Sequence, residues 1–162
     1  MKHTTTKGKN NKESKMTNSN KTKGFTLIEL IMVTIILGIL AAVAIPRYMT
    51  SITKAEEAAE DAVISSITAG LESYATEQMM ATGRRFWPDN PWDGLETKPA
   101  GWANTDADAA NDGEWRFKTS TANITHQRGD NTVHHWDYTK GTQTGANAAP
   151  GSMGAREVGV GN

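Results

Sequence analysis

Two groups of polar residues in the C-terminal half of the chain are of types that could bind a metal ion. The first is a loop with carboxylate and amide oxygens at alternating positions: Asn104, Asp106, Asp108, Asn111 and Asp112. Calcium prefers such hard oxygen ligands. The spacing departs from an EF-hand loop, because Ala109 stands at the turn-glycine position and Trp115 at that of the closing glutamate. A weak calcium loop at Asp106, Asp108 and Asp112 and a solvated turn both remain open.

The second group is three histidines on or near a predicted hairpin: His126, His134 and His135. Neighbouring residues of a strand point to opposite faces, so at most one of His134 and His135 can join His126 in a zinc site. No third ligand is evident, and exposed strand histidines are the expectation. Ser, His and Asp occur without a G-x-S-x-G nucleophile motif, so we predict no catalytic site and no enzyme.

A further carboxylate, Glu29, is the only charged residue in an apolar run of 21 residues from Phe25 to Ile45. As a helix this run is about 31 Å long, which is enough to cross the hydrocarbon core of a bilayer. It is too long for the apolar region of a secretory signal, and no small-residue cleavage site follows it. A carboxylate inside a membrane costs on the order of a few kcal/mol, so Glu29 either has a partner or sits at headgroup level.

Charge is distributed unevenly about this run. Residues 1–24 carry seven Lys and one Glu, and the remainder has ten Lys or Arg against 17 Asp or Glu. A basic segment before an apolar one keeps the N-terminus cytoplasmic by the positive-inside rule. The acidic remainder argues against nucleic-acid binding, which requires a basic face. Residues 1–23 contain nothing to bury and are expected to be disordered.

Helical periodicity continues beyond the apolar run. One mostly apolar stripe consists of Tyr48, Ile52, Ala55, Ala59, Val63, Ile67, Leu71, Tyr74 and Gln78. The acidic residues fall largely on the other side: Glu56, Glu57, Glu60, Asp61, Glu72 and Glu77. Gly83 is predicted to end the helix as a C-terminal cap. The helix therefore has a membrane half, residues 25–46, and an amphipathic half, residues 47–83.

Residues 84–162 are predicted to form a small globular region of loop and sheet. The loop from Arg84 to Gly113 is rich in Pro and Gly, and its four aromatic residues should pack it onto the helix or sheet: Phe86, Trp87, Trp92 and Trp102. Strands are predicted at Glu114–Ser120, Asn123–Gln127 and Thr132–Thr139, with a hairpin turn at 128–131. Gly, Thr, Ala and Asn dominate from Lys140 onward, and the last dozen residues, the tail, are expected to be loosely ordered. The fold class is α+β, a long N-terminal helix packed on a small antiparallel sheet.

The segment around the start of the apolar run has a specific order of residues. It reads Lys23-Gly24-Phe25-Thr26-Leu27-Ile28-Glu29-Leu30 and precedes an uninterrupted apolar helix. This order resembles the processing signal of type IV pilins and type II secretion pseudopilins, strongly over residues 21–50 and more weakly to Gly83. The resemblance implies a structural subunit of an extracytoplasmic filament, either a type IV pilus or a type II secretion pseudopilus.

The resemblance also implies roles for single residues. Prepilin peptidase would cut between Gly24 and Phe25 and methylate the new Phe25 amine, and Glu29 would pair with the amine of a neighbouring subunit to set axial register. The stretch from Gly38 to Pro46 would open on assembly, whereas on its own Pro46 would merely kink the helix where it leaves the membrane. Expected partners are further copies, other pilin-like subunits, the peptidase and an ATP-driven assembly platform. The protein would reside as a single-pass protein in the bacterial inner membrane before assembly, and in a periplasmic or cell-surface filament afterwards.

Two departures from the family pattern concern the ends. The basic segment is long for a leader, and a start at Met16 would give one of nine residues. The chain has no Cys, so it cannot form the C-terminal disulfide of many type IV pilins, which favours a pseudopilin or a minimal pilin. The alternative function is a membrane-tethered periplasmic binding module or enzyme that does not polymerise, which would require neither Gly24 nor Glu29.

Overall fold

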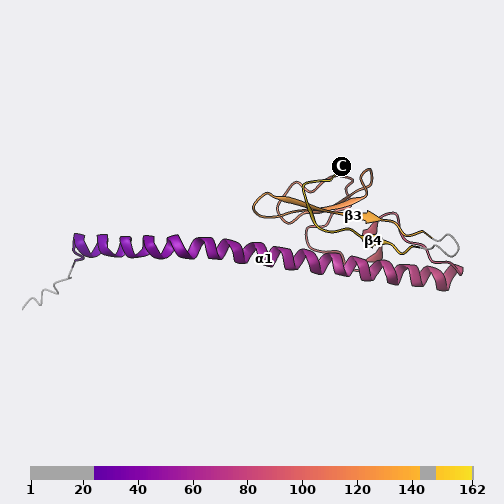
Figure 1. Cartoon of the computed structure of the whole chain (residues 1–162), viewed down its shortest axis with the longest axis horizontal. Coiled ribbons are helices and arrows are strands. Elements are labelled where there is room, and N and C mark those ends of the chain that lie inside the picture. Colours follow the sequence, from indigo (N-terminus) through magenta and orange to yellow (C-terminus); the bar gives the residue numbers. More distant parts are fainter. Residues whose placement is uncertain (1–23, 143–148, 162) are drawn as a thin grey trace, which may run out of the picture. The chain divides into compact units, whose positions relative to one another are not determined.

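The computed structural model describes residues 24–142 and 149–161. The predicted disorder of residues 1–23 and the alternative start at Met16 lie outside the described residues. The chain divides into two compact units, Met1–Ile45 and Pro46–Asn162. Its elements are, in order, one long α-helix, a short 3-10 helix and five strands. The long helix can be followed in Figure 1.

Helix α1 spans Leu27–Thr82, close to the predicted bounds. It ends as the sequence predicts: Gly83 has a φ of 75° and donates its backbone N–H to the Met79 carbonyl over 2.9 Å. That left-handed conformation is readily available to glycine and satisfies one of the free carbonyls of the last turn. A 3-10 helix, η1, spans Pro91–Gly94 and is capped by the Asn90 side chain, which accepts from the Trp92 backbone N–H over 3.1 Å.

The strands form one antiparallel sheet in the second unit. Its strands are β1 (Trp115–Lys118), β2 (Asn123–Gln127), β3 (Val133–Thr139), β4 (Ser152–Met153) and β5 (Glu157–Val158). The order is β1-β2-β3-β4, and β5 also pairs with β3. The predicted hairpin turn joins β2 to β3, with Asn131 in the left-handed region at a φ of 65° and its N–H donating to the Arg128 carbonyl. The α+β fold class is thus confirmed, as are the first three strands.

The core of the second unit lies between one face of this sheet and α1. The helix contributes Ile67, Leu71 and Ala75, and the loop before the sheet contributes Trp87 and Trp92. The inner face of the sheet contributes Trp115, Phe117, Ile124, Trp136 and Tyr138. The alternation in β1 is as predicted, since Trp115 and Phe117 are buried while Arg116 and Lys118 are only half-buried. Trp87 and Trp92 fasten the preceding loop to this core, whereas Phe86 is partly exposed against Tyr74.

Three sequence-based expectations differ from the structure. The sequence pattern predicts Glu60 on the polar side of α1, but its side chain is fully buried. The three histidines were expected to be exposed, yet each is 9% exposed or less. The tail was expected to be loosely ordered, whereas its described residues add β4 and β5 to the sheet and are joined to α1 through Arg156. In all three cases the contacting partners come from segments far apart in the chain, and local composition does not identify them.

Candidate functional site

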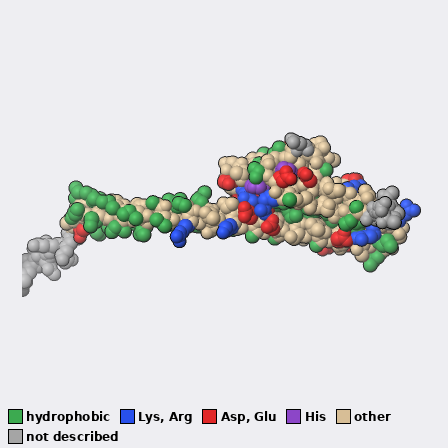
Figure 2. Space-filling model, in the orientation of Figure 1, with side chains coloured by type: hydrophobic (Ala, Val, Ile, Leu, Met, Phe, Trp, Pro, Cys, Tyr) green, Lys and Arg blue, Asp and Glu red, His purple; other side chains and the backbone are tan. Residues whose placement is uncertain are grey.

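The first part of α1 presents an apolar surface. All fourteen large apolar side chains from Phe25 to Ile45 are exposed, and hydrophobic side chains occur along the whole of this stretch (Figure 2). This stretch is long and apolar enough to cross a membrane by length and composition, with a mean hydropathy of 2.8 over 18 residues. Full burial of one such side chain is worth about 1.5–3 kcal/mol. A surface of this kind therefore needs lipid or protein around it.

The start of α1 is closed by reciprocal bonds between Thr26 and Glu29. The Glu29 carboxylate accepts from the Thr26 backbone N–H over 2.8 Å and from the Thr26 hydroxyl over 2.7 Å. The Glu29 backbone N–H donates back to the Thr26 hydroxyl oxygen over 3.3 Å. This is a capping box, which satisfies free donors of the first turn. Glu29 therefore has a partner within its own helix, and its predicted pairing with a neighbouring Phe25 amine stays a prediction.

The other residues of the predicted processing and assembly segment are accessible or lie within regular helix. Gly24 and Phe25 precede the first helical residue, and a Cβ at Gly24 would meet no atom within 4 Å. Gly38 is equally open, and α1 is continuous through Pro46. The Pro46 carbonyl accepts from the Thr50 hydroxyl over 3.1 Å. Cleavage, methylation and helix opening concern other states of the protein and remain predictions.

The three carboxylates of the predicted calcium loop have different surroundings. Asp106 accepts from the Thr119 backbone N–H over 2.7 Å, and Asp108 pairs with Lys118 over 2.6 Å. Asp112 lies beside Gly129, where a Cβ would be 3.5 Å from both carboxylate oxygens. Within residues 24–142 and 149–161, no three His, Asp or Glu side chains are close enough to hold an ion as they stand. Calcium binding stays a prediction.

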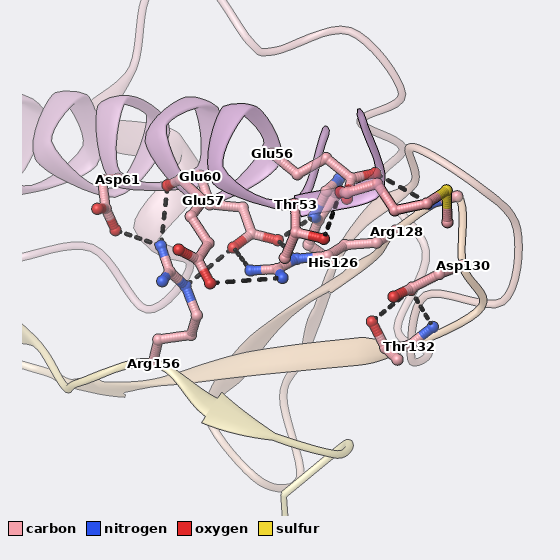
Figure 3. A network of polar contacts seen from close by, with 12 residues as sticks. Thr53, Glu56, Glu57, Glu60, Asp61, His126, Arg128, Asp130, Thr132 and Arg156 are labelled. Atoms are coloured by element: carbon pink, nitrogen blue, oxygen red, sulfur yellow. Dashed lines mark hydrogen bonds and ion pairs between the residues drawn. The ribbon is translucent and has the colours of Figure 1, made fainter. Parts of the chain in front are cut away.

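A buried polar cluster joins α1 to the sheet and the tail (Figure 3). At its centre is the Glu60 carboxylate, which accepts from Arg128 Nε over 2.8 Å and from Arg128 Nη2 over 2.6 Å. His126 Nδ1 lies 2.9 Å from Glu60 Oε1. The two parallel bonds from one guanidinium give this pair a fixed geometry as well as charge attraction.

Arg156 brings the tail into the same cluster. Its Nε lies 2.9 Å from Glu60 Oε2 as an ion pair, and its Nη2 donates to the Glu57 carbonyl over 2.9 Å and contacts Asp61. The hairpin adds one further bond, from the Gly129 backbone N–H to Glu56 Oε1 over 3.2 Å. Helix, hairpin and tail thus meet at a single carboxylate.

The protonation state of Glu60 follows from these contacts. Burial raises the pKa of its carboxyl group, but the hydrogen bonds from Arg128 and His126 outweigh this and lower the pKa to about 2. The carboxylate is therefore ionised at neutral pH, as is Arg128. Sequence reasoning missed the cluster, although a signal was present: Glu60 lies three, four and seven residues before Val63, Ile64 and Ile67, which places it on their side of the helix.

The histidines occupy both faces of the sheet. His126 and His134 are cross-strand partners on the inner face, and His126 stacks on Trp115 with ring centroids 4.2 Å apart. His134 Nδ1 is buried without a hydrogen-bond partner among the described residues. Burial lowers the pKa of His134, and the positive charge of Arg128 lowers it further, so the neutral form of the ring is favoured. His135 points to the outer face, as strand alternation predicts.

Comparison with known proteins finds one family match, which lies in the N-terminal part, and several curated relatives. The family described as the prokaryotic N-terminal methylation motif matches residues 19–45. The type IV major pilin protein PilE1 of Neisseria gonorrhoeae is 40% identical over 86 residues, 53% of this chain and 34% of that protein. The type IV narrow pilus major component PilA5 of Thermus thermophilus is 40% identical over 63 residues, 39% of this chain and 52% of that protein.

A fimbrial protein of Pseudomonas aeruginosa is 42% identical over 55 residues, 34% of this chain and 36% of that protein. The chain thus spans about a third to a half of the length of these curated relatives. No solved structure matches. The family match covers residues 19–45, which contain the apolar segment.

Proposed function

We propose that this chain, which carries the N-terminal segment of the type IV pilin family, is a structural subunit of an extracytoplasmic type IV pilus-like filament. The observation that carries the proposal is the apolar surface between Phe25 and Ile45, in which Glu29 is the only charged residue. Such a surface can leave the bilayer only where neighbouring helices replace the lipid contacts. Identical segments from further copies provide apolar surfaces of matching length.

The match to the methylation motif supports two proposed processing steps. Prepilin peptidase cuts after Gly24, and the same enzyme methylates the Phe25 amine. Removal of residues 1–24 eliminates seven Lys and leaves the apolar helix as the anchor. The processed subunit remains a single-pass protein of the bacterial inner membrane until an ATP-driven platform moves it into the filament. The similarity to two type IV pilus components favours a pilus over a secretion pseudopilus.

Within the filament, Glu29 sets the axial offset between subunits. Its carboxylate exchanges part of its capping bonds to Thr26 for the new Phe25 amine of a neighbour. A buried ion pair of this kind contributes more to specificity than to stability. Opening of the helix between Gly38 and Pro46 adds length on assembly, because Pro46 cannot donate a backbone hydrogen bond to Ala42.

Two variants test the proposal in cells that supply a prepilin peptidase and a pilus assembly platform. Gly24→Val should accumulate as precursor in the membrane, detected by intact mass. A Cβ at Gly24 meets nothing within 4 Å, so the fold is not disturbed. Glu29→Ala should be cut and methylated but yield few or no sheared filaments. The matched control is Glu77→Ala, an exposed carboxylate on the same helix, which should assemble normally.

The outcomes separate the role of Glu29 from the filament function as a whole. Normal filaments from Glu29→Ala would refute the register role of Glu29 but not the proposal that the chain forms filaments. Wild-type protein that keeps residues 1–24 and stays monomeric in the membrane beside an active peptidase would refute the whole proposal. That result would favour a tethered, non-polymerising module instead.

A further inference from the structure

The outer face of the sheet carries a histidine that the proposed filament function does not use. His134 and Trp136 point from β3 toward the core, so His135 between them points to the opposite face. Asp137 follows two residues later on that same face. Glu157 of β5 is the direct cross-strand partner of His135. The three side chains therefore share one side of two paired strands.

The His135 ring is fixed and its proton is assigned by its surroundings. The residue is only 6% exposed, and its Nδ1 lies 2.9 Å from the Gly159 carbonyl oxygen. A carbonyl can only accept, so Nδ1 must carry a proton. In the neutral ring this leaves Nε2 with a lone pair and no proton. A backbone carbonyl that orients the far nitrogen is the usual support of a metal-binding histidine.

Nε2 faces two carboxylates at distances too long for hydrogen bonds. It lies 3.9 Å from Asp137 Oδ1 and 3.9 Å from Glu157 Oε2. Among the described residues, neither carboxylate has a Lys or Arg partner within ion-pair distance. An unprotonated nitrogen and two anions turned toward one another repel unless a positive charge lies between them.

Space for such a charge exists beside these groups. A pocket of about 480 Å³ is lined by His135, Asp137, Glu157 and residues 158–161. Gly161 helps to keep the nitrogen accessible, because a Cβ there would lie 3.1 Å from His135 Nε2. Its φ of 74° is also one that larger residues rarely adopt.

We propose that His135, Asp137 and Glu157 bind a divalent transition-metal ion of the zinc type. One imidazole nitrogen, two carboxylates and an open position for water form a donor set that zinc accepts. The two carboxylates neutralise the charge of the ion. Binding ties β5, and with it the tail, more firmly to β3.

The carboxylates must move to close the site. As they stand, no three such side chains of the described ranges are close enough to hold an ion. Two ligand atoms on a tetrahedral zinc are about 3.3 Å apart, so each carboxylate must approach Nε2 by about half an ångström. The side chains of Asp137 and Glu157 are 64% and 67% exposed, so rotation about their single bonds is unhindered by packing. The His135 ring is thus already in position, and only the two carboxylates move to bind the ion.

The test titrates the full-length protein in detergent with Zn²⁺ by calorimetry and with Co²⁺ by visible absorption. We expect one ion per chain and the intense absorption of four-coordinate Co²⁺. Asp137→Asn and Glu157→Gln should each weaken binding at least tenfold. Both residues are exposed, so these variants should fold. Glu77→Gln is the matched carboxylate control and should bind like the wild type.

A second control addresses the other histidines. His134→Gln should retain the ion, because its ring points to the opposite face of the sheet. No binding up to millimolar Zn²⁺ would overturn the proposal. Affinity unchanged in Asp137→Asn and Glu157→Gln, or lost only in His134→Gln, would also overturn it. All measurements use unassembled protein, so their outcome is independent of filament formation.

Discussion

Glu60 of α1 and Arg128 of the β2–β3 hairpin form a two-bond ion pair, although 68 residues separate them in the chain. Both side chains are at least 96% buried. Arg156 and His126 contact the same carboxylate, so the pair is the point where helix, hairpin and tail are joined. This unit contains no Cys, and the cluster links the tail to the helix without a disulfide.

Removal of the central carboxylate should destabilise the second unit strongly. Glu60→Ala leaves Arg128 buried without its partner, and breaking a buried pair in this way costs about 3–5 kcal/mol. Urea unfolding of the full-length protein in detergent, followed by tryptophan fluorescence, measures the change. Glu77→Ala should change the free energy of unfolding by less than about 0.5 kcal/mol. A loss below about 1 kcal/mol for Glu60→Ala would show that the cluster contributes little.

The same carboxylate predicts a loss of stability in acid. Its folded pKa of about 2 lies below the ordinary value of 4.5, so its contribution is complete above pH 4.5 and is lost as the pH falls through about 2. The free energy of unfolding that is lost in this way is on the order of 3 kcal/mol. Unfolding free energies measured from pH 6 to pH 2 should fall more steeply for wild type than for Glu60→Gln. Parallel curves for the two proteins would contradict the prediction.

A close backbone contact should make Gly70 intolerant of a side chain. A Cβ at Gly70 would lie 2.3 Å from the carbonyl oxygen of Gly94, the last residue of η1. Overlap of this kind costs about 1–3 kcal/mol, more than the helix propensity that alanine adds. Thermal unfolding of Gly70→Ala compared with Ser65→Ala, on the exposed side of the same helix, measures the effect. A melting temperature of Gly70→Ala equal to or above wild type would show that η1 shifts freely.

The tail should detach when Arg156 loses its charge. Arg156→Gln removes the ion pair with Glu60 and weakens the contact with Asp61, and charge-assisted bonds contribute about 1.5–3 kcal/mol. Hydrogen exchange should show faster exchange of the Gly159 amide, which donates to the Val133 carbonyl over 2.8 Å. Lys140→Gln, which removes the exposed pair with Asp89, is the control. Unchanged protection at Gly159 in Arg156→Gln would mean that β5 pairing alone holds the tail.

The sequence predicted the elements whose causes are local. The apolar run and the helical period that follows it predict α1, and Gly83 predicts its end, because each depends on residues within one or two turns. Alternation in β1 and the turn residues before Asn131 predict the hairpin for the same reason. The motif from Gly24 to Glu29 is defined by the order of residues along the chain, so it can be recognised without knowledge of the fold.

Only the tertiary structure determined which groups meet across the sheet and the helix. The side of α1 on which Glu60 lies could be inferred from spacing, but its partners Arg128 and Arg156 stand 68 and 96 positions further along the chain. Likewise, His135 and Glu157 face each other because β5 pairs with β3 in one register. Register is set by the packing of the whole core, because a shift of one residue would turn every side chain to the other face. The sequence by itself therefore determined the helix, the hairpin and the processing motif. Long-range packing determined the cluster around Glu60 and the group of side chains around His135.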